Sequence, residues 1–316
     1  MRRRSSNGGI QKCGNYRCTR RDLMSNRLIR FFHSGDLGDL VASLAAVKKV
    51  CEREGAKAFL YLDKTGGLDS QNSVEIRDTL IKQTGGQGLK MDERGIKFLL
   101  PLIVSQPYVE NAIAVDRCPS NVDYNLNAFR KYFFDRRLTL TEGQNLMYLQ
   151  QRLLDVPQQY EPWLEVKPFA QGVKCIVARS LRYQSAHSAF PRFAEYLRGA
   201  CFIGTDLEHA AFLDAFRFPI PRFKVSDALH AARAIASSQC FIANGTLFYW
   251  IGVGMGHPNI VHEVGLDVPT TVFSDADSKR LGITYICGSR IVDAESMNLF
   301  KIRGTYSSIK KEAEQE

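Results

Sequence analysis

The chain of 316 residues has no long apolar segment and no signal-peptide pattern. The apolar stretch from Ile96 to Val104 already contains Lys97, whereas a membrane-spanning helix needs about 20 apolar residues. A secretory signal peptide needs an apolar core near the N-terminus, but this region is polar and basic. We therefore expect no transmembrane segment and a cytoplasmic location.

Several common catalytic and nucleotide-binding motifs are also missing. The chain holds no G-x-x-x-x-G-K-[ST] phosphate loop and no G-x-G-x-x-G directly after a strand pattern, which argues against P-loop ATP hydrolysis and ordinary dinucleotide binding. The nucleophile elbow G-x-S-x-G is absent, and His262-Glu263 lacks the second histidine of the zinc motif H-E-x-x-H. None of these standard motifs is therefore available to indicate which reaction the chain catalyses.

The eight cysteines do not form the motif pairs of a disulfide or zinc framework. Several lie in apolar, strand-like segments such as 174–177 and 239–242, which predicts reduced, buried thiols in an intracellular protein. Cys13 and Cys18 are the only close pair, and without a second pair nearby they supply at most half of a zinc site. No two histidines have helical metal-ligand spacing either, so we expect no metal site.

Positive charge is concentrated at the N-terminus. The whole chain carries +9, from 42 Lys and Arg against 33 Asp and Glu. Residues 1–26 contain seven basic side chains against Asp22 alone, which is +6 and leaves +3 for the remainder. This polar segment lacks hydrophobic periodicity and is predicted to be a disordered basic tail. The folded part is only mildly basic, which suits a site for phosphates without demanding a nucleic-acid groove.

From residue 27 the strand and helix patterns alternate, as is typical of an α/β fold. A strand at 28–33, a helix at 39–54 and a strand at 58–62 form a parallel unit. The middle is less regular, and the predicted features there are a Gly-rich loop at 85–88, a strand at 111–115 and a helix near 144–154.

Alternation returns after a segment with three prolines, 155–172, which is our candidate linker. The predicted strands of this second part are 173–178, 200–203, 240–243 and 259–262, and the predicted helices are 192–198, 206–216, 226–236 and one from about 246. We therefore predict two doubly wound α/β domains that face a central cleft, 27–160 and 161–290, with 291–316 as a C-terminal helix or tail.

The first strand-to-helix loop is rich in residues that suit a ligand site. Glycines allow a sharp turn with accessible amides, and ligand clefts in open parallel sheets form at the carboxyl ends of the strands. Asp39 at the predicted helix start has two readings, a helix N-cap or a catalytic carboxylate in the cleft. The candidate ligand-contacting residues of this loop are Ser34, Gly35, Asp36 and Gly38.

Two loops of the second part repeat this arrangement. Glu208 follows the Gly204-Thr205 turn, and it either caps its own helix or accepts hydrogen bonds from ribose hydroxyls. Further on, a helix N-terminus at Asn244-Gly245-Thr246 could seat a diphosphate. The loop after residue 178 could add phosphate contacts from Arg179, Ser180 and Arg182.

The order of these segments resembles the heptosyltransferase-like branch of the GT-B glycosyltransferases. The matching features are G-D-x-G-D-x-x-x-x-L after the first strand, G-x-x-x-E-H in the second part, and an N-G-T-L turn followed by Gly256-His257-Pro258-Asn259-Ile260. The resemblance covers most of residues 27–265. It implies two Rossmann-like domains and inverting transfer of a hexosyl or heptosyl group from a nucleotide-diphosphate sugar to a hydroxyl acceptor, without metal or other cofactor.

The same resemblance assigns roles to individual residues. Asp39 matches the base that activates the acceptor hydroxyl, and Glu208 matches the residue that holds the ribose. Asn244, Gly245 and Thr246 match the turn that contacts the donor's diphosphate and sugar.

The chain departs from this family at three places, and the departures keep other functions open. One is that the helix after the first loop lacks the family's usual proline. Family members usually read D-T-G followed by histidine where this chain has N-G-T and Tyr249, and their phosphate-gripping lysine has only an approximate substitute in Arg182. One alternative is a non-catalytic nucleotide-binding module of the same fold. Another is a phage-type glycosyltransferase that modifies DNA, in which the basic tail would attract phosphates.

Overall fold

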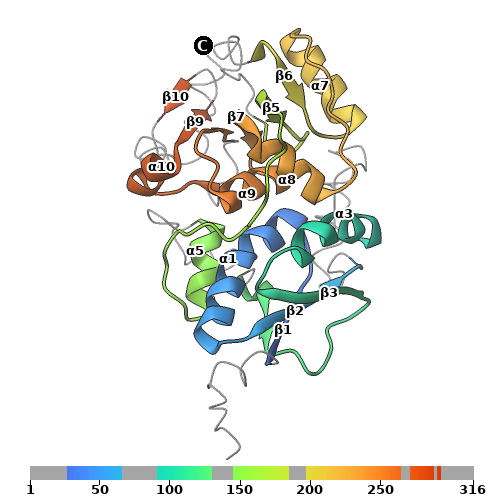
Figure 1. Cartoon of the computed structure of the whole chain (residues 1–316), viewed down its shortest axis with the longest axis vertical. Helices are drawn as coiled ribbons and strands as arrows, with labels where there is room; N and C mark the ends of the chain where they lie inside the picture. The colour runs from blue at the N-terminus through green and yellow to red at the C-terminus, as the bar shows by residue number, and fades with distance from the viewer. Residues whose placement is uncertain are drawn as a thin grey trace, which may run out of the picture.

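The computed structural model describes residues 27–65, 91–129, 145–184, 197–264, 271–287 and 290–292, and it has an α/β fold with two separate sheets. The two halves of the molecule stack along its long axis, one sheet in each (Figure 1). The tail expected over 1–26, the Gly-rich loop at 85–88, most of the helix expected at 192–198 and the segment after Val292 lie outside the described residues.

The first sheet has the strand order β3-β2-β1-β4, with all pairs parallel. Its strands are β1 (Leu28–His33), β2 (Lys57–Asp63), β3 (Val109–Val115) and β4 (Tyr124–Asn125), the last followed by the short 3₁₀ helix η1 (Leu126–Ala128). Its helices are α1 (Leu37–Glu54), α3 (Glu93–Val104) and α5 (Leu146–Leu153). The predicted strand-helix-strand unit is confirmed, whereas β4 was not predicted because two residues carry no period-2 signal.

The second sheet has the order β10-β9-β8-β7-β5-β6, parallel except for the β9-β10 pair. Its strands are β5 (Val173–Ala178), β6 (Ala200–Phe202), β7 (Ser238–Asn244), β8 (Ile260–Glu263), β9 (Ile283–Cys287) and β10 (Arg290–Val292). Its helices are α7 (Asp206–Phe216), α8 (Ala228–Ala236), α9 (Leu247–Met255) and α10 (Asp275–Leu281). Residues 291 and 292 therefore extend this sheet as a strand, and α8 is capped by Asp227.

The linker segment forms no regular secondary structure from residue 156 to 172, but part of it is buried between the halves. The backbone N–H groups of Trp163 and Leu164 both donate to the carbonyl of Gly254 at the end of α9. The Trp163 indole N–H donates to the carbonyl of Val41 in α1 at 2.8 Å. One tryptophan thus connects a helix of each half.

Helices from both halves pack together where the two sheets meet. Helices α8 and α9 lie on the side of the second sheet that faces α1 and α3 (Figure 1), with α1 against α9 and α3 against α8. Helix α9 is apolar around its whole circumference and is buried from Leu247 to Gly254, as expected for a helix enclosed on all sides. The larger hydrophobic core consequently runs through both halves.

The predictions on membrane-spanning segments and on cysteines can be compared with the residues that the structure describes. None of the described helices is long and apolar enough to cross a membrane. Cys51, Cys175 and Cys240 are buried free thiols, as predicted, whereas Cys118 is exposed; Cys13 and Cys18 lie outside the described residues.

Candidate functional site

A cavity of about 690 Å³ lies between the two halves, at the carboxyl ends of strands from both sheets. Loops after β1, β5, β6 and β7 all contribute to its wall. Of the fourteen residues selected from the sequence, eleven line it: Asp36, Gly38, Asp39, Arg179, Ser180, Arg182, Gly204, Thr205, Glu208, Gly245 and Thr246. Ligand sites of α/β proteins typically occupy this position.

The N-termini of four helices converge on this cavity. Their N-cap residues, Asp36 of α1, Thr205 of α7, Asp227 of α8 and Thr246 of α9, all belong to its lining. The caps of α7 and α8 are closed by side-chain hydrogen bonds, whereas α1 and α9 have no such bond. Helix N-termini carry partial positive charge and first-turn N–H donors, so the cavity suits an anionic ligand.

Asp39 lies in the first turn of α1 and lines the cavity. The helix begins at Leu37, two residues earlier than predicted, so its N-cap is Asp36 and the N-cap reading of Asp39 was wrong. Gly38 lies against α9 here: a Cβ on Gly38 would come within 3.3 Å of the Leu247 backbone nitrogen. The start of α1 therefore packs directly on the start of α9.

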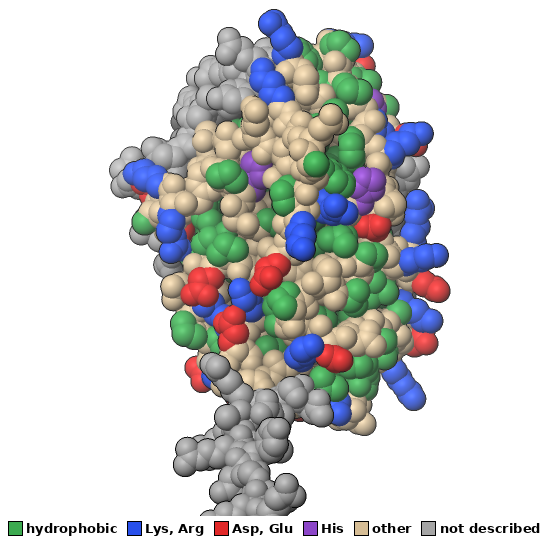
Figure 2. Space-filling view, in the orientation of Figure 1, with side chains coloured by type: hydrophobic (Ala, Val, Ile, Leu, Met, Phe, Trp, Pro, Cys, Tyr) green, Lys and Arg blue, Asp and Glu red, His purple; other side chains and the backbone are tan. Residues whose placement is uncertain are grey.

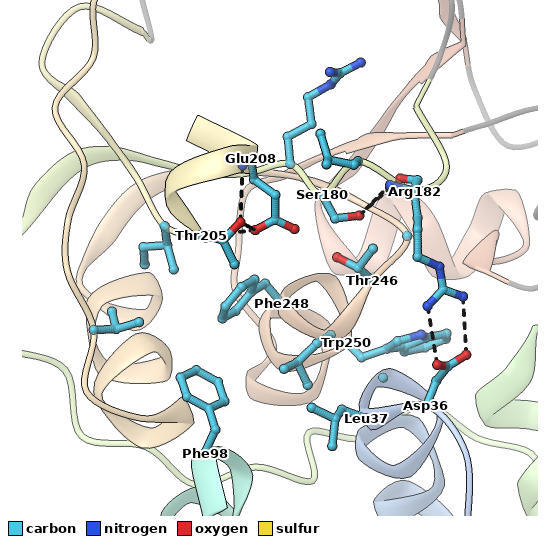
Figure 3. A pocket seen from close by; sticks show the side chains of 18 of the residues that line it. Asp36, Leu37, Phe98, Ser180, Arg182, Thr205, Glu208, Thr246, Phe248 and Trp250 are labelled. Atoms are coloured by element: carbon cyan, nitrogen blue, oxygen red, sulfur yellow. Dashed lines mark hydrogen bonds and ion pairs between the residues drawn. The ribbon is translucent and has the colours of Figure 1, made fainter. Parts of the chain in front are cut away.

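Glu208 caps its own helix, which is one of the two readings that the sequence left open, and it also lines the cavity. Its Oε2 accepts hydrogen bonds from the Thr205 backbone N–H at 2.7 Å and the Thr205 hydroxyl at 3.0 Å, which completes a capping box. Figure 3 shows the carboxylate folded back to Thr205, with its other oxygen turned toward the cavity. Burial raises the pKa of this carboxyl group. Gly204 leaves room for the fold-back, because a Cβ there would lie 2.9 Å from Oε2.

The two arginines after β5 have different partners. Arg179 is buried, and its Nε and Nη2 donate to the two carboxylate oxygens of Glu263 at 2.6 and 2.9 Å. This bidentate pair fixes the end of β5 to the end of β8, so the predicted phosphate contact of Arg179 is not supported. Arg182 extends instead toward Asp36 at the start of α1 (Figure 3).

Asn244, which the sequence predicted as a donor contact, is not among the residues that line the cavity. It is buried, and its Oδ1 accepts from the Ser180 backbone N–H at 3.0 Å. Its Nδ2 donates to the carbonyls of Ser180 and Arg182. An aspartate could not donate these two bonds, which explains why asparagine fits here. Asn244 thus holds the arginine loop, while Gly245 and Thr246 reach the cavity.

Ser34 and Gly35, two further predicted ligand contacts, also lie outside the lining. The Ser34 backbone N–H donates to Oδ1 of Asn127, and the Gly35 carbonyl accepts from the Met91 backbone N–H. Gly35 has φ +113°, a left-handed conformation that glycine adopts without strain. These two residues therefore turn the chain into α1, and the following four residues form the wall.

One side of the cavity is apolar, which the sequence analysis missed. Phe98 of α3 and Phe248 of α9 approach edge to face at 6.5 Å between ring centroids, and Leu37 and Trp250 lie beside them (Figure 3). The sequence analysis predicted no helix over 93–104 and gave none of these four residues a place in the site. Nothing in a single helix shows that its apolar face will meet a helix of the other half.

Basic residues of α3 complete the lining. Arg94 and Lys97 are exposed at the cavity and form no ion pair with the residues that the structure describes. Several Lys and Arg side chains lie along the side of the molecule that carries α3 (Figure 2). The helix was not predicted as such, because Pro101 lies within it.

Comparison with known proteins identifies the fold. E. coli ADP-heptose LPS heptosyltransferase II matches with a TM-score of 0.51 and 11% sequence identity, over 90% of this chain and 99% of that chain. The chain shares its fold with that enzyme. No family model and no curated protein sequence matches.

Two further solved structures are similar at lower TM-scores. E. coli heptosyltransferase WaaC with ADP matches with a TM-score of 0.44 and 12% identity, over 86% of this chain and 98% of that chain. The iron-containing dodecameric glycosyltransferase TibC from enterotoxigenic E. coli H10407 matches with 0.44 and 13%, over 78% of this chain. The chain spans 60% of the length of TibC.

Proposed function

We propose that this chain is a glycosyltransferase of the GT-B type that transfers a sugar from a nucleotide-diphosphate donor to a hydroxyl acceptor. In this proposal residues 27–160 and 161–290 are two Rossmann-like domains that face each other across the cavity. The fold shared with a heptosyltransferase supports it. The observation that carries it is the meeting of Asp39, Arg182, Glu208 and the uncapped α9 N-terminus in one cavity between two parallel sheets.

The second half supplies the donor contacts. The first-turn N–H groups of α9, after Gly245 and Thr246, would bind the diphosphate, since the N-cap residue Thr246 makes no side-chain capping bond to them. The Arg182 guanidinium can add charge-assisted hydrogen bonds to phosphate oxygens. The cavity-facing oxygen of Glu208 would accept from the ribose hydroxyls while its other oxygen keeps α7 capped.

Asp39 is the proposed base from the first half. The acceptor oxygen attacks the anomeric carbon, the bond from that carbon to the diphosphate oxygen breaks, and the acceptor proton passes to Asp39. The α1 N-terminus favours the ionised carboxylate that this role requires. The departing diphosphate is stabilised by the α9 N-terminus and Arg182. A single displacement of this kind inverts the anomeric centre, and we assign it no metal.

The proposed location is the cytoplasm, because buried free thiols fit a reducing compartment.

The test of this function begins with nucleotide binding by the wild-type protein. Calorimetric titration with UDP, GDP, ADP and CDP should show binding of one of them, and the corresponding nucleotide sugars should then be turned over. If none of the nucleotides binds, the glycosyltransferase proposal is wrong.

Asp39→Asn tests the base. We expect it to leave nucleotide affinity nearly unchanged and to lower turnover by about 10²–10⁴-fold, the usual contribution of a general base. Asp214→Asn is the matched control, because Asp214 is an exposed residue of α7 that forms a surface ion pair with Arg217. Equal turnover in Asp39→Asn and wild type would contradict the assignment.

A non-catalytic nucleotide-binding module is the second candidate, and the ion pairs favour it. Both arginines near the proposed diphosphate seat are paired with carboxylates, Glu263 and Asp36. Such a module would be stabilised thermally by a nucleotide yet form no product from any nucleotide sugar.

A further inference from the structure

Arg182 and Asp36 form an ion pair that joins the two halves at the cavity. Nη1 and Nη2 of the Arg182 guanidinium each lie 3.3 Å from one carboxylate oxygen of Asp36, across the cavity wall (Figure 3). Nη2 also donates to the Tyr183 hydroxyl at 2.5 Å, and the guanidinium lies 4.8 Å from the Tyr183 ring centroid. The Tyr183 hydroxyl and the Asn244 side-chain amide, which donates to the Arg182 carbonyl, therefore hold Arg182 in place independently of Asp36.

Three features show that Arg182 and the loop that carries it are not in their most favourable arrangement. The contacts of 3.3 Å are longer than the 2.7–2.9 Å typical of charge-assisted hydrogen bonds. The Nε donor of Arg182 is buried and has no hydrogen-bond partner among the residues that the structure describes, which is costly for a buried donor. Tyr183 has φ +58°, a left-handed conformation unfavourable for a residue with a side chain.

Asp36 also leaves its own helix position incomplete. It is the N-cap of α1, and aspartate is among the best capping residues, yet its side chain makes no capping hydrogen bond. The carboxylate is turned toward Arg182 instead. Release from Arg182 would allow it to cap α1, which offsets part of the cost of losing the ion pair.

We propose that Asp36 is an internal counter-ion of Arg182 that the diphosphate of a bound nucleotide displaces. This inference rests on the proposed function for the identity of the ligand. In the nucleotide-free chain Asp36 occupies the Nη1 and Nη2 donors; on binding, phosphate oxygens take these donors and Asp36 turns back to cap α1. Asp36 is thus a positioning residue that weakens diphosphate binding and favours release of the nucleoside-diphosphate product. This replaces its predicted role as a direct nucleotide contact.

The substitution Asp36→Asn separates charge from shape. Asparagine keeps the size and the capping ability of aspartate but loses the negative charge. We expect inorganic pyrophosphate and the preferred nucleoside diphosphate to bind about 3–30-fold more tightly in calorimetric titration at low salt, because an ion-pair competitor and a like charge are removed. Glu54→Gln is the control, since it removes an ion pair with Arg27 on the first half, outside the cavity lining, and should leave both affinities unchanged.

A double-mutant comparison assigns the effect to Arg182. In the Arg182→Gln background, Asp36→Asn should tighten pyrophosphate binding by a clearly smaller factor, because no guanidinium remains to be released. An equal factor in both backgrounds would overturn the displacement. Asp36→Ser, also uncharged and a good N-cap, repeats the test if the asparagine variant does not fold.

The outcomes separate this inference from the proposed function. Unchanged or weaker binding in Asp36→Asn, with normal nucleotide binding by wild type, overturns the counter-ion role and leaves the glycosyltransferase proposal intact. Tighter pyrophosphate binding in the variant, with no nucleotide bound by wild type, supports the counter-ion role and overturns the donor assignment. Absence of both pyrophosphate and nucleotide binding overturns both.

Discussion

Glu208 has one observed role and one proposed role: it completes the capping box of α7, and we propose that it also binds the ribose. Oε2 is used by the capping box with Thr205, and the carboxylate also lines the cavity. Capping requires only a hydrogen-bond acceptor, which glutamine supplies as well as glutamate. Ribose binding by an ionised carboxylate requires the charge. The two roles can therefore be separated by substitution.

Glu208→Gln should keep the capping box and lose the charge. We expect a change in thermal midpoint of at most about 1 °C but nucleotide binding weaker by roughly 1–3 kcal/mol, the scale of a hydrogen bond to a charged group. Glu208→Ala should lose binding and, in addition, about 0.5–1.5 kcal/mol of stability, because the hydrogen bond from the Thr205 backbone N–H to Oε2 is lost while the Thr205 cap remains. Calorimetry and thermal unfolding of both variants measure the two effects. A glutamine variant that binds as tightly as wild type would leave Glu208 with the capping role alone.

At the scale of single elements, α9 connects the site to the linker. Its N-terminus contributes Thr246 and Leu247 to the cavity, and its C-terminal turn accepts the backbone bonds of Trp163 and Leu164. Gly254 permits this approach, because a Cβ there would come within 2.9 Å of the side chains of both linker residues. The position of the helix N-terminus is thus fixed by packing at its opposite end.

The substitution Gly254→Ala shows which of two opposing effects on stability is larger, the tight packing against the linker or the higher helix propensity of alanine. Propensity alone predicts a gain of about 1 kcal/mol for alanine in a helix. We expect the opposite, a loss of about 1–3 kcal/mol, because the added methyl group overpacks a closed interface. Urea denaturation measures the free energy of unfolding, and Ala210→Gly at an exposed position of α7 reports the propensity term separately. A more stable Gly254→Ala variant would show that the linker contact is loose.

At the scale of the whole molecule, buried neutral histidines make stability depend on pH. His262 is fully buried under the Tyr249 ring and lies 2.9 Å from the Thr271 hydroxyl, behind the cavity wall. Burial lowers the pKa of His262 to about 3, and burial also lowers the pKa of His257. Below pH 6.5 these histidines are therefore protonated in the unfolded chain but stay neutral in the folded chain.

The free energy of unfolding should therefore fall as the pH decreases from about 6.5 toward 3. The slope from His262 is about 1.4 kcal/mol per pH unit once the unfolded histidine is protonated, and His257 adds to it in the same direction. Urea unfolding at pH 7.5, 6 and 5 measures this loss. His262→Gln removes one titrating group, so its stability should depend less steeply on pH even if its stability at pH 7.5 is lower. An unchanged slope in that variant would contradict the buried neutral state.

The sequence alone determined the order of most elements and the location of the cavity. Period-2 and period-3.6 patterns are local, so β1, α1, β2, β5, α7 and α9 could be recognised without knowledge of their neighbours. Parallel strands bring their carboxyl ends to one edge, so glycine-containing loops such as Gly204-Thr205 could be expected to meet at a ligand site. These signals placed eleven residues in the cavity wall.

The tertiary structure alone decided which partners these residues have. Arg179 binds Glu263, Arg182 binds Asp36 and Asn244 binds the arginine loop, and the partners are separated by 62 to 146 positions. A charged or amide side chain has several chemically equivalent partners in a sequence, and only the packing of the two halves selects one. The apolar faces of α3 and α9 form a cavity wall for the same reason. Whether such a face is buried depends on what lies opposite the helix, and the sequence pattern of the helix does not contain that information.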